Sequence, residues 1–120
     1  MIIITPNNKI SISILQEMAK NMFGNLVKAV VDVQEEIMAV DGELHADEEV
    51  LLMEKGSKRS DVWGINLYPG SFGGEQFIEF DSMINLKPSQ GNRTRGVDDI
   101  EIRKRIFEIV QKLVVKDETN

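Results

Sequence analysis

Acidic, amide and arginine side chains gather in one stretch of the chain, residues 77–96, which reads FIEFDSMINLKPSQGNRTRG. Its first half alternates apolar and polar residues and carries Glu79 and Asp81, whereas its second half is a loop rich in amides, glycines and arginines. Guanidinium groups bind carboxylates and phosphates through paired hydrogen bonds, and carboxylates orient polar groups or accept protons. These residue types predict a site for a small anionic ligand or a protein partner.

Strand alternation in residues 77–86 puts the two carboxylates on one face of the expected sheet. Pairing of this strand with residues 62–68 would place Asn66 beside Glu79 and Gly64 beside Asp81. A glycine beside an aspartate leaves open space above the sheet, where a ligand can approach the backbone. We therefore expect ligand-binding residues on this polar face and in the Ser89–Gly96 loop that follows it: Asn66, Glu79, Asp81, Asn85, Gln90, Asn92, Arg93 and Arg95.

The same residues leave other interpretations open. An antiparallel sheet normally has one solvated face, where Arg93 and Arg95 would simply pair with Asp81, Glu79 or the acidic middle of the chain. Alternatively, a small hydrolase or transferase acting on a phosphorylated or nucleotide-like substrate would use His45 or Asp81 as acid or base. The sequence has neither the GxxxxGK[ST] phosphate loop nor a GxSxG nucleophile motif, so it does not establish an enzyme.

His45 is the only histidine and lies among acidic residues in ELHADEE. A neighbouring carboxylate raises the affinity of imidazole for a proton, and zinc accepts histidine together with carboxylates. However, the chain has no cysteine, and HExxH and EF-hand spacings are both absent. We expect no metal and no cofactor, and an ordinary position for His45 at the start of a helix.

Charge is unevenly distributed along the chain. With 14 Lys and Arg against 20 Asp and Glu, general nucleic-acid binding is not expected, because duplex binding normally needs a basic patch. Residues 35–54 contain eight acidic and no basic residues, whereas residues 87–105 contain six basic and three acidic residues. This asymmetry predicts ion pairs within the chain or, as a further alternative for its function, homodimerisation.

The length of 120 residues and an apolar content of 42% suit one compact domain over residues 1–120. The absence of cysteine excludes disulfides and fits a reducing cytoplasm. The apolar start MIIITP is too short for a signal peptide or a membrane span, so we expect a cytoplasmic protein that does not interact with membranes.

The expected fold class is α+β, with a mainly antiparallel sheet of four to five strands, the long first and last helices on one face, and one short helix. Strands are expected in MIIITP and at residues 26–33, 37–40, 62–68 and 77–86, with Tyr68 opposite Phe77. The turn at Asp41-Gly42 favours positive φ at both residues, with a brief return strand over residues 43–46. Helices are expected from Ser13 to Gly24, from Asp47 to Gly56, and over about 15 residues after Asp98-Asp99.

The motifs GELHADEE, WGINLYP, IEFDSMIN and KPSQGNRTRG together give the chain a family resemblance. From about Leu26 to the last helix, it resembles an uncharacterised family of small bacterial and archaeal proteins, a domain of unknown function. This resemblance implies no activity, substrate, cofactor or partner.

Overall fold

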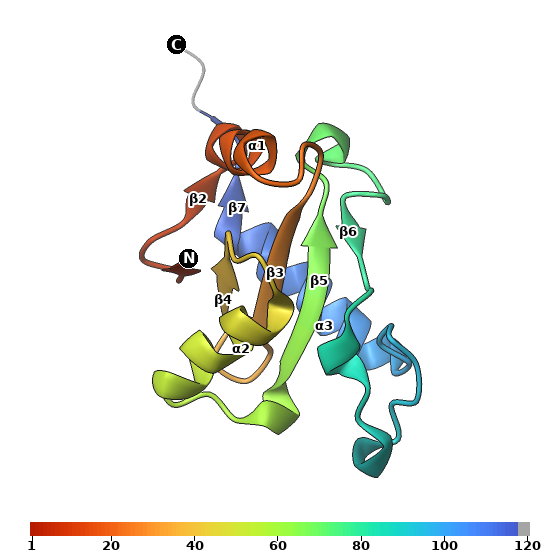
Figure 1. Cartoon of the computed structure of the whole chain (residues 1–120). Helices are drawn as coiled ribbons and strands as arrows, with labels where there is room; N and C mark the ends of the chain where they lie inside the picture. The colour runs from red at the N-terminus through yellow and green to blue at the C-terminus, as the bar shows by residue number, and fades with distance from the viewer. Residues whose placement is uncertain (118–120) are drawn as a thin grey trace.

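The computed structural model describes residues 1–117, which form three α-helices around a five-stranded antiparallel sheet (Figure 1). The strands lie in the order β1 (Ile2–Ile4), β4 (Ile37–Val40), β3 (Val27–Asp32), β5 (Val62–Leu67) and β6 (Ile78–Glu79). The helices are α1 (Ile12–Asn21), α2 (His45–Glu54) and α3 (Ile100–Leu113). The expected α+β class and mainly antiparallel sheet are confirmed.

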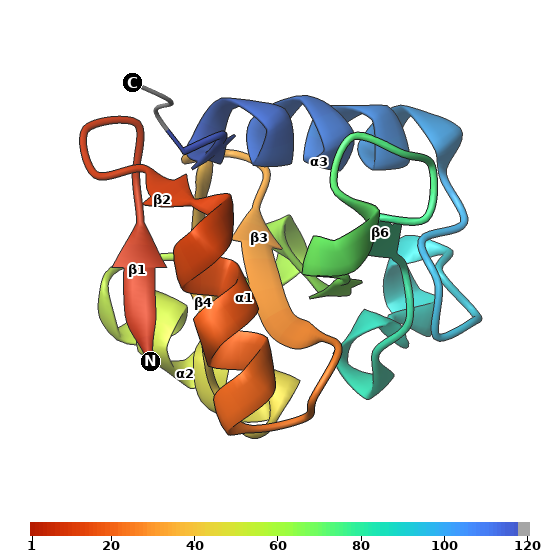
Figure 2. The same ribbon diagram turned by 90° about the horizontal axis from the view of Figure 1, so that it is seen from above.

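Helices cover both faces of the sheet, and Figure 2 shows α3 and α2 on opposite sides of β3 and β4. On one face, Leu15 of α1 and Ile106 of α3 join the apolar cluster that includes Val31 of β3. On the other face, Leu52 of α2 packs into a smaller cluster with Val30. The expectation that this second face is mainly polar is therefore wrong over β3 and β4, where α2 covers it.

The strands expected at residues 26–33 and 37–40 form as β3 and β4 and pair as an antiparallel hairpin. Val31 pairs with Met38, and the turn after Asp32 reaches a positive φ of 58° at Glu36. Asp32 Oδ1 accepts the backbone N–H groups of Gln34 and Glu35 at 2.9 and 3.0 Å, so the aspartate side chain stabilises the turn.

Helix starts differ from the expected positions. Ser11, and not Ser13, is the N-cap of α1, because its hydroxyl accepts the N–H of Ile14. Helix α2 begins at His45 and includes Asp47, which was expected to be its N-cap. The chain does not pair back over residues 43–46, because only Asp41 of the expected turn has a positive φ, of 70°, and the helix already begins at His45.

Strand β6 keeps the expected register but is much shorter than residues 77–86. Asn66 pairs with Glu79, and the N–H of Tyr68 donates to Phe77 O at 2.9 Å. After Glu79 the chain leaves β5, and Met83–Asn85 form a turn of 3-10 helix whose Ile84 N–H is capped by the Ser82 hydroxyl. Strand alternation therefore stops predicting side-chain direction beyond this point.

A second, parallel pairing joins segments near the two ends of the chain and was not predicted from the sequence. Strand β2 (Ile10–Ser11) pairs with β7 (Val114–Val115), which directly follows α3. Two-residue strands carry too little pattern to be recognised in a sequence, and the partners lie 104 residues apart.

The charge asymmetry is partly used within the chain. Glu36 of the acidic segment accepts from Lys112 at 2.9 Å and pairs with Arg105 at 3.3 Å, both on α3. These contacts, with the hydrogen bond from Lys112 the largest cause, lower the pKa of Glu36. Within residues 1–117, no helix is both long enough and apolar enough to cross a membrane.

Candidate functional site

Several of the predicted site residues line one pocket of about 240 Å³ between α2, the strands β3 and β5, and the segment from residue 81 to residue 95. The pocket combines charged, amide and apolar side chains: Lys28, Leu44, His45, Ala46, Asn66, Asp81, Ser82, Met83, Ile84 and Arg95. A larger hollow of about 660 Å³ lies between α1 and residues 68–71. No buried, unpartnered polar atom of residues 1–117 belongs to the residues that line this larger hollow.

Asn66 provides a hydrogen-bond acceptor that the fold leaves unused. Its Nδ2 donates to Glu79 Oε1 at 2.8 Å and to the backbone oxygen of Asp81 at 3.3 Å, so the orientation of the amide is fixed. The residue is only 6% exposed, and its Oδ1 has no partner within residues 1–117. Leaving such a buried acceptor without a donor costs about 1–3 kcal/mol, which a ligand donor would recover.

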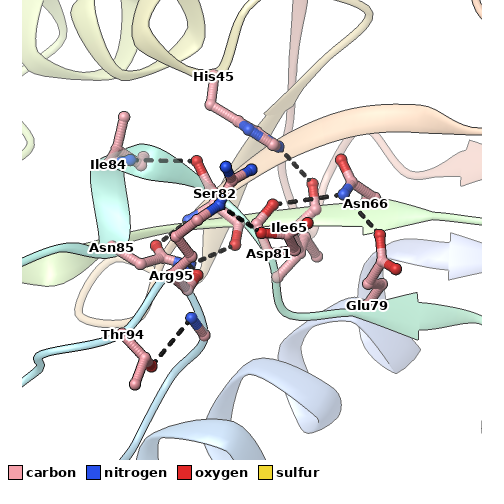
Figure 3. A network of polar contacts seen from close by, with 12 residues as sticks. His45, Ile65, Asn66, Glu79, Asp81, Ser82, Ile84, Asn85, Thr94 and Arg95 are labelled. Atoms are coloured by element: carbon pink, nitrogen blue, oxygen red, sulfur yellow. Dashed lines mark hydrogen bonds and ion pairs between the residues drawn. The ribbon is translucent and has the colours of Figure 1, made fainter.

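His45 contributes a second acceptor to the same pocket (Figure 3). Its Nε2 lies 2.7 Å from Ile65 O and must donate, because a carbonyl only accepts. Burial lowers the pKa of His45, and the nearby Lys28 and Arg95 lower it further, so the ring is neutral at neutral pH. Nδ1 then carries a lone pair, and it makes no hydrogen bond within residues 1–117.

Arg95 and Asp81 form an ion pair at the pocket. Arg95 Nε donates to Asp81 Oδ1 at 2.7 Å, and the guanidinium extends toward the His45 ring (Figure 3). Both side chains are about half exposed, so the pair itself adds little stability. The two terminal guanidinium nitrogens make no hydrogen bond within the described part of the chain and remain available to a ligand.

Asn85 and Asn92, expected to face a ligand, instead hold the loop in place. The side chain of Asn85 is fully buried, and it bonds both the N–H and the C=O of Gly64 and the carbonyl of Arg95 at 2.8–2.9 Å. Asn92 Nδ2 donates to three backbone carbonyls, and its Oδ1 accepts the N–H of Asp98 at 2.7 Å. The expected exposure of Asn85 is wrong, because the strand ends before reaching it.

The open space expected above Gly64 is absent. An added Cβ on Gly64 would lie 2.5 Å from both Cβ and Oγ of Ser82, and Ile84 is also close. Asp81 was expected at this position, but the turn that follows β6 places Ser82 there instead.

Gly64→Ala is expected to lower the free energy of unfolding by about 1–3 kcal/mol, because the new methyl group has no room and β5 is an interior strand of the sheet. Urea denaturation followed by circular dichroism would measure this loss. Gly70→Ala is the matched control, since nothing lies within 4 Å of its added Cβ. Equal stability of the two variants would show that Ser82 does not fill this space.

The remaining predicted residues lie outside the pocket lining. Glu79 lies at the edge of the pocket, where its carboxylate accepts hydrogen bonds from the side chains of Asn66 and Tyr68. Burial and the Glu79 carboxylate together raise the pKa of Tyr68. Gln90 donates to Ser60 O at 3.1 Å on another part of the surface. Arg93 is exposed, and its backbone N–H donates to Asp98.

Asp98 and Asp99 have different roles at the start of α3. Asp99 is the N-cap, and its carboxylate accepts the N–H of Glu101. Asp98 accepts instead from the Thr94 hydroxyl and from the N–H of Arg93, and these bonds lower its pKa. The Ser89–Gly96 loop is therefore tied back onto the start of the helix.

Lys87 anchors the other side of the loop. It is 6% exposed and donates to the carbonyls of Arg59 and Val62 at 2.5 and 2.6 Å, with its ammonium over the Trp63 ring. Burial lowers its pKa to about 8. Its charge is directed into the structure and away from the pocket lining.

Sequence reasoning missed the contribution of Lys28 and of the apolar pocket wall. Lys28 alternates with Val27 and Ala29 and pairs with Asn66 across β3 and β5, so a strand register between 26–33 and 62–68 would have located it. No sequence pattern marks the apolar wall formed by Leu44, Met83 and Ile84, because the positions of these residues depend on the turn after β6 and on the early start of α2. Residues 1–117 contain no group of three or more His, Asp and Glu side chains placed to hold a metal ion.

Comparison with known proteins gives one family match. The model of a family described as protein of unknown function (DUF5674) matches residues 2–113. No curated protein and no solved structure matches the chain.

Proposed function

We propose that this chain, which belongs to the DUF5674 family of proteins of unknown function, is a binding module for a small ligand that bears an anionic group. The ligand would occupy the pocket lined by His45, Asn66, Asp81 and Arg95. Arg95 and Lys28 supply positive charge, and Asn66 and His45 supply acceptors for a donor group of the ligand.

The observation that carries this proposal is the buried, unpartnered Oδ1 of Asn66. Buried polar atoms are nearly always hydrogen-bonded, and an unpaired one needs a physical reason. Here the atom belongs to a residue that lines a concave surface together with two cations. A bound ligand supplies the missing donor and accepts from the cations.

The size of the pocket restricts the ligand. A volume of about 240 Å³ lies below the roughly 300–1,000 Å³ of pockets that hold drug-sized ligands. A carboxylate with a few carbon atoms fits this volume better than a nucleotide does. Action on a phosphorylated or nucleotide-like substrate, binding of a protein partner and homodimerisation remain predictions without a comparable observation.

Arg95→Gln is expected to weaken the stabilisation by small anions. We would measure thermal unfolding of the wild type with acetate, lactate, glycine, L-leucine and inorganic phosphate, each over a concentration series. A ligand at about 100 times its Kd raises the free energy of unfolding by about 2.7 kcal/mol, which shifts Tm by several degrees. Loss of one charged hydrogen bond, worth about 1.5–3 kcal/mol, would weaken binding by at least tenfold.

Arg93→Gln is the matched control, because Arg93 is an exposed arginine of the same loop that does not line the pocket. This variant removes the same charge from the protein, and each ligand is expected to raise its Tm as much as it raises the Tm of the wild type. Equal losses in both variants would indicate a nonspecific charge effect and contradict the proposed pocket. The absence of any shift in the wild type with all five compounds would also contradict it.

A further inference from the structure

We infer that the ligand of this pocket is a free α-amino acid with an apolar side chain, an inference that rests on the proposed function. Three kinds of group converge on the pocket: cations, unpartnered acceptors and exposed apolar side chains. An amino acid presents the three complementary groups, a carboxylate, an ammonium and a side chain, on one α-carbon.

A cationic residue and an acceptor residue are neighbours in the pocket lining, and the ammonium of the cationic residue, Lys28, lies 5.3 Å from the centre of the Phe23 ring. Lys28 and Asn66 are directly paired residues of the adjacent strands β3 and β5. Facing side chains on neighbouring strands lie close enough to contact one small group together. This arrangement suits a ligand whose anionic and donor groups are also neighbours, as the carboxylate and ammonium of an α-amino acid are.

The number of free acceptors favours an ammonium over a peptide N–H. Asn66 Oδ1 and His45 Nδ1 each lack a donor within residues 1–117, and Asp81 adds a carboxylate beside them. An ammonium carries three N–H donors and can satisfy several acceptors, whereas the amide at the C-terminus of a peptide carries one. A free amino acid therefore matches the pocket better than a peptide end does.

The charges near the pocket also suit a zwitterion. Lys28 and Arg95 are offset by Asp81 in the lining and by Glu79, which binds Asn66 from the edge. His45 is neutral because burial lowers its pKa. An amino acid, with one charge of each sign, leaves this balance unchanged, whereas a doubly charged phosphate adds unpaired negative charge.

Apolar side chains flank the polar groups. Leu44, just before α2, is 57% exposed, and Met83, in the turn after β6, is 62% exposed. Both line the pocket together with the partly buried Ile84. Large apolar side chains left in water beside a polar pocket provide the contact surface for an apolar ligand side chain.

Calorimetric titration of the full chain with L-leucine and three analogues tests this inference. Leucinamide lacks the carboxylate, N-acetyl-L-leucine lacks the ammonium, and glycine lacks the side chain. Each is expected to bind at least tenfold more weakly than L-leucine. Binding of N-acetyl-L-leucine as tight as that of L-leucine would overturn the free amino acid and indicate a peptide C-terminus.

The apolar wall is tested with Met83→Ala, which is expected to weaken L-leucine binding about threefold to tenfold and to leave glycine binding unchanged. Met53 is another exposed methionine, and it does not line the pocket. Met53→Ala is therefore the control and should change neither L-leucine binding nor glycine binding. Acetate or lactate binding as tightly as L-leucine, with the same dependence on Arg95, would overturn this inference while the proposed function stands. If none of the compounds binds, both the inferred amino acid ligand and the proposed function are contradicted.

Discussion

Replacement of Asn85 by alanine is expected to lower the free energy of unfolding by roughly 3–5 kcal/mol, which is a large part of the stability of a chain of this size. Strand β6 ends at Glu79, so Gly64 of β5 has no strand neighbour on that side. The carboxamide of Asn85 replaces it, accepting the N–H of Gly64 and donating to its C=O. Alanine would leave both groups buried and unpaired, at about 1–3 kcal/mol each.

Urea denaturation followed by tryptophan fluorescence would measure the effect, because Trp63 is adjacent to Gly64 in the core. Gln90→Ala is the control, since this exposed amide of the same segment makes one solvent-exposed bond to Ser60. It is expected to change stability by less than about 0.5 kcal/mol. A mild effect of Asn85→Ala would indicate that water replaces the carboxamide, and the loop would then not depend on this residue.

Glu48→Gln is expected to stabilise the protein by up to about 3 kcal/mol at neutral pH. Glu48 is fully buried on α2; its Oε2 accepts the N–H of Gly42 at 3.0 Å, and Oε1 has no partner within residues 1–117. Burial raises its pKa from 4.5 to about 9, so the folded protein keeps this carboxyl protonated near neutral pH. Holding the proton costs about 1.4 kcal/mol for each pH unit above the pKa of the unfolded chain.

The sign of this linkage gives a test in the wild type. Because the folded pKa is raised, the contribution of Glu48 to stability is complete below pH 4.5 and is lost progressively as the pH rises to about 9. Glutamine does not titrate, so the gain from Glu48→Gln should be small near about pH 5 and largest near about pH 9. Glu54→Gln, at the exposed end of α2, is the control with no such pH-dependent gain.

The parts of the fold that could be predicted from the sequence are those in which a repeating pattern meets a buried surface. Val27, Ala29 and Val31 alternate on one face of β3, and pairing Leu67 with Ile78 keeps two apolar residues together. A slip of one residue would expose both, which is why the register at β6 was predictable. Helix α3 was predictable for the same reason, because Ile106, Ile109 and Val110 repeat at helical spacing.

The candidate site was only partly predictable, because single hydrogen bonds decide its shape. Alternation continues in the sequence past Glu79, but the bonds of Ser82 and Asn85 end the strand, and no periodic signal marks them. Asn66, Asp81 and Arg95 were expected together and do line one pocket, whereas Arg93 and Gln90 do not. The residue type alone does not show whether Asn85 and Asn92 are exposed, because an asparagine side chain forms hydrogen bonds with backbone groups as readily as with a ligand.

The pairing of β2 with β7 has a consequence for the order of events during synthesis. Val114, which is buried in the main apolar cluster, reaches its place only when Ile10 lies beside it. Translation delivers Ile10 long before Val114, so the N-terminal segment emerges from the ribosome without its neighbour. The pairing of β2 with β7 therefore closes only after Val115 has been synthesised, and until then the apolar segment around Ile10 lacks this strand partner.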